Sequence, residues 1–342
     1  MLYNFVMTKQ KITPQTFEKA KFYNPQDMGI AYICALVAPY VISLLLVLVC
    51  QIVISSGVPA ESIESSVVYT IFSCLCSPIA FAIVFFAFNK VKKVSFSAAK
   101  VKFKIGIVNT VVCFAVALIC VFGMQYLIGG IDYVLQLGGY NLTQITLPMD
   151  NFGWLVLALI LMALLPAIFE ELVFRGILLN GLRKGLSDIS ALLFISALMF
   201  ALMHGSIQQL VYPFALGLVL GWLAMRTGST FTSMLVHFLN NAIVIIINYF
   251  TVRHGLDMSV SYTNAWVWVL AIVVAAVAGV LIYLIERFYF KGKNQDEEND
   301  QQTEKQQSKT GFKNMPISFW VSIGVAVIIF IIGTAIGFMP SA

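Results

Sequence analysis

The chain of 342 residues is 60% hydrophobic and only 11% charged, with a formal net charge of +5. Its mean hydropathy of +0.89 is far from the balance of a soluble globular domain, which this composition therefore excludes. The composition indicates an integral, multi-pass membrane protein. Residues 1–28 carry charged side chains and no long apolar stretch, so we do not expect a cleavable signal peptide there.

Apolar runs of about 20 residues can cross a bilayer as α-helices. The sequence therefore predicts an all-α fold, a polytopic transmembrane helix bundle of about eight to nine spans. The expected spans cover residues 29–55, 66–89, 105–131, 152–181, 188–206, 207–226, 230–250, 264–287 and 316–338.

The spans suggest a division of the chain into segments. Residues 1–28 are expected to be a cytoplasmic segment, and residues 29–151 to hold the first three spans. A core of spans four to seven follows in residues 152–250, and span eight lies within 251–290. Residues 291–314 are polar and of mixed charge, which predicts a flexible linker before a last span within 315–342.

Basic residues mark one side of the predicted bundle. Lysine and arginine gather before the first span, in the loop 90–104, at Arg183 and Lys184, and around residues 287–293. The opposite loops carry mainly acidic residues, with Arg253 as an exception. Because basic loops stay in the cytoplasm, we expect a cytoplasmic N-terminus. The same distribution explains the positive net charge, so we expect no nucleic-acid partner.

Three charged residues interrupt the fourth span, where ionisable groups are costly and rarely accidental. Glu171 and Arg175 are four residues apart and share a helix face, so they can form an ion pair that serves only as a structural clasp. Glu170 lies about 100° around the helix and has no partner four residues away. Glu170 is therefore the carboxylate left for chemistry, and a low-dielectric site suits a base that takes a proton from water.

Two of the three histidines also lie in predicted spans. His204 ends the fifth span, and His237 lies in the seventh span with Asn241 four residues later on the same face. At 1.5 Å per residue, Glu170, His204 and Asn241 lie at a similar depth of roughly 20–24 Å from the basic side, and His237 lies about one turn closer to the cytoplasm. We therefore expect one shared site that opens toward the cytoplasmic half. A GxxxG pattern at Gly217 and Gly221 predicts close helix packing in the sixth span.

These residues form three ordered motifs, each on its own helix: Glu170-Glu171 with Arg175, Phe200 with His204, and His237 with Asn241. The set resembles the CPBP family of intramembrane proteases, also called Abi or type II CAAX-protease-like. The resemblance covers about residues 152–250. It implies a helical membrane core that acts as a CAAX prenyl protease 2-like peptide hydrolase and cleaves peptides by attack of water.

The chemistry of the motifs agrees with this implication. We hypothesise that Glu170 and His204 position and deprotonate the attacking water, and that His237 and Asn241 donate hydrogen bonds to the developing oxyanion. Glu171 and Arg175 would pair their charges and hold the helix, and Phe200 would have a structural role. Substitution of Glu170 should then abolish cleavage.

The sequence leaves the cofactor open. Glu170, His204 and His237 could supply a His₂Glu zinc set with water as the fourth ligand, although no HExxH helix is present. Asn241 beside His237 favours an oxyanion hole and metal-free catalysis.

Two other classes of function fit a buried glutamate and histidines. The chain could be a non-catalytic membrane scaffold or a bacteriocin-immunity factor, or a proton-coupled transporter, although it shows no inverted repeat. For the protease, we expect a hydrophobic or lipidated peptide substrate, with membrane lipid as the other partner, in a bacterial plasma membrane. Nothing in the residues indicates that the substrate is prenylated.

Overall fold

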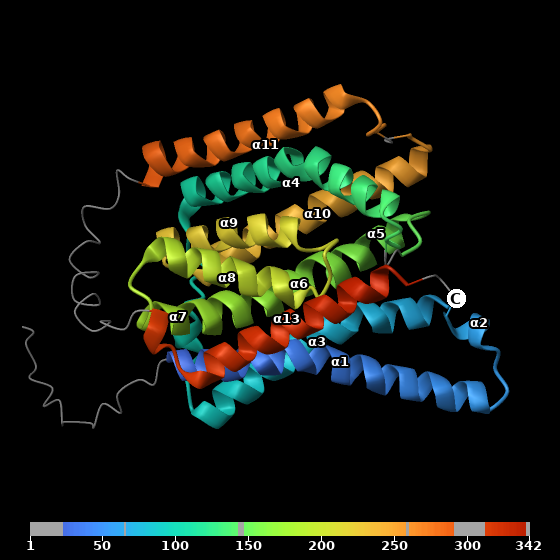
Figure 1. Ribbon diagram of the computed structural model, residues 1–342, viewed down its shortest axis with the longest axis horizontal. Helices are drawn as coiled ribbons and strands as arrows, with labels where there is room; N and C mark the ends of the chain where they lie inside the picture. The colour runs from blue at the N-terminus through green and yellow to red at the C-terminus, as the bar shows by residue number, and fades with distance from the viewer. Residues whose placement is uncertain (1–22, 65, 143–146, 258–259, 291–311, 340–342) are drawn as a thin grey trace, which may run out of the picture.

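The computed structural model describes residues 23–64, 66–142, 147–257, 260–290 and 312–339. Within these ranges the secondary structure is helical, with no strand, which confirms the all-α polytopic bundle (Figure 1). Most of the expected N-terminal segment and of the polar linker, residues 1–22 and 291–311, lie outside the described residues. The helices are α1 Pro25–Ser55, α2 Ala60–Glu64, α3 Val67–Lys92, η1 Phe96–Ala99, α4 Gly106–Leu137, α5 Phe152–Ala158, η2 Leu159–Leu164, α6 Leu165–Glu171, η3 Leu172–Leu179, α7 Asn180–Gly185, α8 Ile189–Met203, α9 Val211–Thr227, α10 Thr230–His254, α11 Ala265–Ile285, η4 Glu286–Phe290, η6 Phe312–Asn314 and α13 Ile317–Gly337.

Seven helical stretches in the described residues are long and apolar enough to cross a membrane. The fifth and sixth spans expected from the sequence are shorter than predicted, because α8 has 15 residues and α9 has 17. Helices of this length reach only about 22–26 Å, short of the ~30 Å hydrocarbon core. In Figure 1 they form a hairpin whose turn, residues 204–210, ends short of the right-hand ends of α4 and α10.

The fourth span, Phe152–Gly185, is a continuous helix in which two π-helical stretches, η2 and η3, flank the α-helical turn α6. Pro166 stands at the start of α6 and has no N–H to donate to the carbonyl of Met162, one turn earlier. After Glu171, the side chain of Asn180 donates to the carbonyls of Arg175 and Gly176, both at 2.9 Å. The irregular backbone thus lies on both sides of the two glutamates, as is frequent at functional sites.

Close helix packing fixes the neighbours of this span. A Cβ atom at Gly217 in α9 would lie only 3.1 Å from Cα of Ala197 in α8, which agrees with the packing role expected for the GxxxG pattern. A Cβ atom at Gly29 in α1 would lie 2.5 Å from the carbonyl carbon of Ser318 in α13. The last helix therefore packs against the first, backbone to backbone (Figure 1).

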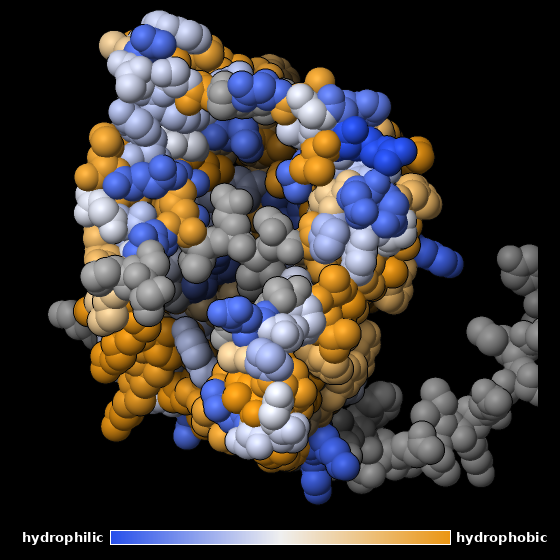
Figure 2. Space-filling model, turned by 90° about the vertical axis from the view of Figure 1, so that its right-hand side faces the viewer, coloured by the Kyte–Doolittle hydropathy of each residue, from blue (hydrophilic) through white to orange (hydrophobic). Residues whose placement is uncertain are grey.

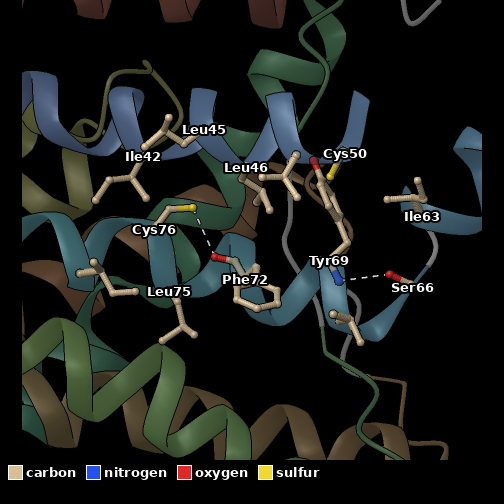
Figure 3. Close-up of a pocket in the computed structure, with 13 residues that line it drawn as sticks. Ile42, Leu45, Leu46, Cys50, Ile63, Ser66, Tyr69, Phe72, Leu75 and Cys76 are labelled. Atoms are coloured by element: carbon tan, nitrogen blue, oxygen red, sulfur yellow. Dashed lines mark hydrogen bonds between the residues drawn. The ribbon is translucent and has the colours of Figure 1, made fainter. Parts of the chain in front are cut away.

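An apolar groove of about 390 Å³ lies between α1 and α3, near α2 (Figure 3). Leu46, Tyr69 and Phe72 are among its lining residues, together with Cys50 and Cys76. Its walls consist almost entirely of apolar side chains, so it is a surface suited to hydrocarbon rather than to water.

Candidate active site

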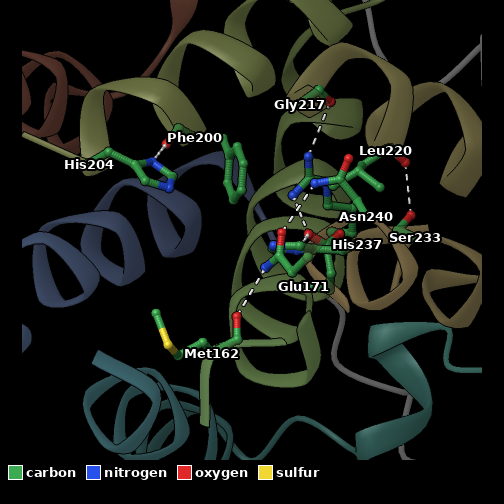
Figure 4. Close-up of polar contacts among 11 residues, drawn as sticks. Met162, Glu171, Phe200, His204, Gly217, Leu220, Ser233, His237 and Asn240 are labelled. Atoms are coloured by element: carbon green, nitrogen blue, oxygen red, sulfur yellow. Dashed lines mark hydrogen bonds and ion pairs between the residues drawn. The ribbon is translucent and has the colours of Figure 1, made fainter. Parts of the chain in front are cut away.

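The predicted site residues come from α6 with the adjoining η3, which carries Arg175, and from two further elements that meet them in the middle of the bundle (Figure 4). Glu170 and Glu171 end α6. His204 caps the C-terminus of α8, one turn after Phe200. The third element, α10, supplies the remaining polar groups.

A fully buried ion pair lies at the centre of the site. Nη1 of Arg175 donates to Oε1 of Glu171 at 2.7 Å, and both side chains are 0% exposed. Nη2 of Arg175 donates to the carbonyl oxygen of Gly217 in α9 at 3.1 Å. The arginine therefore ties the fourth span to α9.

The same oxygen of Glu171 also contacts Nδ1 of His237 in α10 at 3.0 Å. A carboxylate paired with an arginine is an acceptor only, so Nδ1 of His237 carries the hydrogen. The other ring nitrogen, Nε2, then holds the lone pair in the neutral imidazole. Glu171 thus does more than the expected clasp, because it also fixes the orientation and tautomer of His237.

The ring of Phe200 separates the two histidines. Its centroid lies 5.1 Å from that of His204 and 6.0 Å from that of His237, both in edge contacts. The guanidinium carbon of Arg175 lies 4.6 Å from the same centroid, which is a cation–π contact. Figure 4 shows the phenylalanine ring between His204 and the cluster of Glu171 and His237.

His204 is anchored by its own helix. Its Nδ1 lies 2.9 Å from the carbonyl oxygen of Phe200, which can only accept, so Nδ1 carries the hydrogen. The lone pair of Nε2 is therefore free to accept from water or substrate. His204 is only partly buried, whereas His237 is 4% exposed.

Asn241 belongs to a chain of hydrogen bonds. Tyr212 of α9 donates to Oδ1 of Asn240, and Nδ2 of Asn240 donates to Oδ1 of Asn241 at 3.1 Å. Nδ2 of Asn241 donates to the carbonyl of Met162 at 3.3 Å, the carbonyl that Pro166 cannot reach. The carboxamide is thus oriented at both ends, and its second N–H remains available.

Glu170 differs from its neighbour. Its side chain is only partly buried, and it makes no hydrogen bond to another described residue. It lies within electrostatic range of His237, Glu171 and Arg175. The two adjacent glutamates thus have different surroundings, one paired and enclosed and the other accessible.

The structure therefore brings Glu170, Glu171, Arg175 and His237 together, and it places His204 across the Phe200 ring from them. Asn240 and Tyr212 are not among the site residues that the sequence predicts. Asn240 directly precedes Asn241, so a second buried amide in α10 was visible in the sequence. Tyr212 had no such signal, because its contact joins residues 28 positions apart.

Glu170, His204 and His237, the possible zinc ligands, are not grouped at metal-ligand spacing in the described residues. No three histidine, cysteine, aspartate or glutamate side chains are grouped closely enough to hold a metal ion in the part of the chain that the structure describes. Both histidines present a free Nε2, as a metal ligand would. Their separation by Phe200 nevertheless does not fit a shared ion, so we derive no step through a metal.

Comparison with known proteins bears out the resemblance to the CPBP family. Residues 152–243 match the family of type II CAAX prenyl endopeptidase Rce1-like proteins. Searches of curated proteins and of solved structures gave no significant match. The matched range contains every residue of the three motifs, whereas α1 to α4, α11 and α13 lie outside it.

The buried pair predicts a strong coupling between its members. Glu171→Gln or Arg175→Met alone should lower the free energy of unfolding by about 3–5 kcal/mol, because each leaves an unpaired charge in the core. The double variant should lose less than the sum of the two single variants. Titration of the detergent-solubilised protein with SDS measures all three, and strictly additive losses would contradict the coupling.

Proposed function

Since residues 152–243 form an Rce1-like domain, we propose that the protein is an intramembrane endopeptidase that hydrolyses hydrophobic or lipidated peptides with water activated by Glu170. The observation that carries the proposal is the contrast between Glu170 and Glu171. The first is accessible and has no hydrogen-bond partner among the described residues, as a base needs. The second is committed to Arg175 and His237.

Two acceptors define where the water would lie. In the proposed mechanism the carboxylate of Glu170 accepts one hydrogen of the attacking water and the Nε2 lone pair of His204 accepts the other once substrate is bound, which directs the oxygen's lone pair at the peptide carbonyl. Glu170 takes the proton as the C–O bond forms. When the tetrahedral intermediate collapses, the C–N bond breaks and Glu170 returns this proton to the leaving amine.

The oxyanion would be held from α10. One N–H of the Asn241 side-chain amide donates to the carbonyl of Met162, and the second N–H is available for the oxyanion. The amide is already oriented by the hydrogen bond that it accepts from Asn240. His237 donates its Nδ1–H to Glu171, so it can donate from Nε2 to an oxyanion only as the imidazolium. In that form the cluster of Glu170, Glu171, Arg175 and His237 holds two negative and two positive charges, which suits a poorly solvated site.

Substitution of the base tests this assignment. Glu170→Gln keeps the size of the side chain but cannot accept the proton, so cleavage should fall by about 10²–10⁴-fold or more. The reporters are a peptide ending in a CAAX sequence with a farnesylated cysteine and the same peptide without the lipid. Peptides released by membranes with wild-type and variant protein provide a readout that needs no chosen substrate.

Glu61→Gln, in α2 and away from the site, is the matched control and should cleave as the wild type does. Thermal unfolding in detergent establishes that both variants are folded. Full activity of the Glu170→Gln variant would remove this residue from its role. If the biological phenotype survived while no peptide was released, the chain would be a scaffold or immunity factor.

Chelation tests the metal-free mechanism. Because the donors Glu170, His204 and His237 are not grouped around one point, cleavage should persist in the presence of 1,10-phenanthroline. Elemental analysis of the purified protein should find no stoichiometric zinc. Loss of activity with the chelator, and recovery with zinc alone, would contradict the mechanism.

The route to the site is the next step of the proposal, and it differs from the expected opening toward the cytoplasmic half. On the side of the basic loops, a continuous run from Leu172 to Leu179 is buried, so no water path follows this span. On the side opposite the basic loops, the hairpin of α8 and α9 is short, so the turn after His204 lies deeper in the bundle than the ends of α4 and α10. Polar backbone at such a depth is tolerated where it lines a cavity or is enclosed by protein.

Figure 2 views the end of the molecule opposite the basic loops, where hydrophilic and hydrophobic side chains border a recess. With the basic loops in the cytoplasm, this recess faces the outside of a bacterial cell. The peptide would then reach Glu170 and His204 from the non-cytoplasmic side or from the outer leaflet.

Thiol labelling in intact cells tests this route. Gln209 lies exposed in the turn after His204, so a Gln209→Cys variant should react with a membrane-impermeant maleimide without disruption of the cells. A Lys104→Cys variant, exposed in a basic loop, should react only in opened cells. The wild type gives the background of its six native cysteines. Labelling of the Gln209→Cys variant only after cell disruption would contradict the route.

A further inference from the structure

The last helix, α13, contacts the turn that carries His204. This helix lies far outside the Rce1-like range, 152–243, and follows the expected linker. It nevertheless packs alongside α1 and against α8 (Figure 1). In Figure 4 a helix of the α13 colour passes beside the end of α8 at His204.

Two neighbouring residues of α13 make the contact. The backbone N–H of Ile207 donates to Oγ1 of Thr334 at 3.0 Å. Gly333 lies against the carbonyl oxygen of Gly205, so closely that a Cβ atom at Gly333 would overlap it. One contact satisfies a backbone donor of the turn, and the other sets how near the turn lies to α13.

The turn depends on this support because its backbone leaves the helix abruptly. Gly205 has φ +73°, the left-handed conformation that ends α8 directly after His204. The amide of Ile207 has no other acceptor among the described residues than Thr334. A donor left unpaired at this depth is costly, so loss of the threonine oxygen should displace the turn.

The position of α13 is itself fixed elsewhere. At its start, Ser318 and Phe319 touch the backbone of Gly29 in α1. At its end, the carbonyl of Gly337 accepts from the backbone N–H of Asn141, after α4, at 2.7 Å. The helix is therefore held by contacts on both sides of Gly333, so its position relative to α1 and α4 is fixed.

The neighbouring helix α1 supports the same end of α8. The hydroxyl of Tyr32 donates to the carbonyl of Met199 at 2.6 Å, in a buried contact one residue before Phe200. The backbone that carries Phe200 and His204 is thus held from α1 and α13, two helices that the matched family range does not include.

We propose that α13 positions His204 for catalysis, with Thr334 and Gly333 as positioning residues that hold the turn after it. The inference rests on the proposed function only for its effect on cleavage. The contact itself predicts a change in the backbone protection of residues 204–210, which hydrogen–deuterium exchange detects without any substrate. Thr334 and Gly333 touch no reacting atom.

Paired substitutions in α13 test the proposal. Thr334→Val removes the acceptor at nearly constant volume, Thr334→Ser retains it, and Gly333→Ala pushes the turn away. Gly324→Ala is the matched control, because a Cβ atom there meets nothing within 4 Å. Two readouts are needed: hydrogen–deuterium exchange of the segment 204–210, and kcat and KM on the CAAX reporters.

In the Thr334→Val variant, exchange in segment 204–210 should rise while the rest of α8 stays protected. The value of kcat should fall on the order of ten- to a hundred-fold, because small displacements of a catalytic group have large effects. KM should change little, since the substrate contacts remain. Thr334→Ser should restore both readouts, Gly333→Ala should behave like Thr334→Val, and Gly324→Ala should match the wild type.

Unchanged exchange in both the Thr334→Val and the Gly333→Ala variant would overturn the proposal, as would increased exchange with a wild-type kcat. Equal losses of kcat in the valine and serine variants would also overturn it. A wild-type protein that cleaves no reporter contradicts the proposed function instead. Even then, the exchange data decide whether Thr334 holds the turn.

Discussion

A single buried carboxylate oxygen organises the centre of this protein. Oε1 of Glu171 accepts from Arg175 and from His237 at the same time, inside a bundle that offers no bulk water to either charge. Removing Glu171 leaves the arginine and the histidine donor without their acceptor, and removing Arg175 leaves the carboxylate without its ionic partner. The cluster therefore requires α6, η3 and α10 to meet at one point, and it imposes the relative position of these helices.

Neutral groups around this cluster, a backbone carbonyl and an aromatic ring, also fix the positions of the neighbouring helices. Arg175 also donates to the carbonyl of Gly217, a residue whose missing side chain lets α9 pack closely against Ala197 and Phe200 of α8. Phe200 in turn covers the guanidinium and separates the two histidines. The apolar motif residue is thus the spacer that gives each imidazole its own surroundings.

Hydrophobic runs and helical spacing were enough to predict the helices and the pairing partner of Glu171, because both depend on local sequence. The contact between Glu171 and His237 joins residues 66 positions apart, and the contact between Ile207 and Thr334 joins residues 127 apart. Periodicity carries no information on such pairs. The short length of α8 was also missed, because the polar residues that follow His204 interrupt an apolar run without a clear boundary.

The site combines two opposite demands, and the helix geometry satisfies both with adjacent residues. Glu171, paired and enclosed, fixes the helices, whereas the proposed mechanism requires its neighbour Glu170 to stay accessible and unpaired so that it can take a proton. Rigidity around Glu170 comes from charges inside the matched family range, but rigidity around His204 comes from hydrogen bonds with α1 and α13, outside it. The Rce1-like range therefore contains the residues of the proposed mechanism, while the backbone that carries one of them, His204, is held by α1 and α13 outside that range.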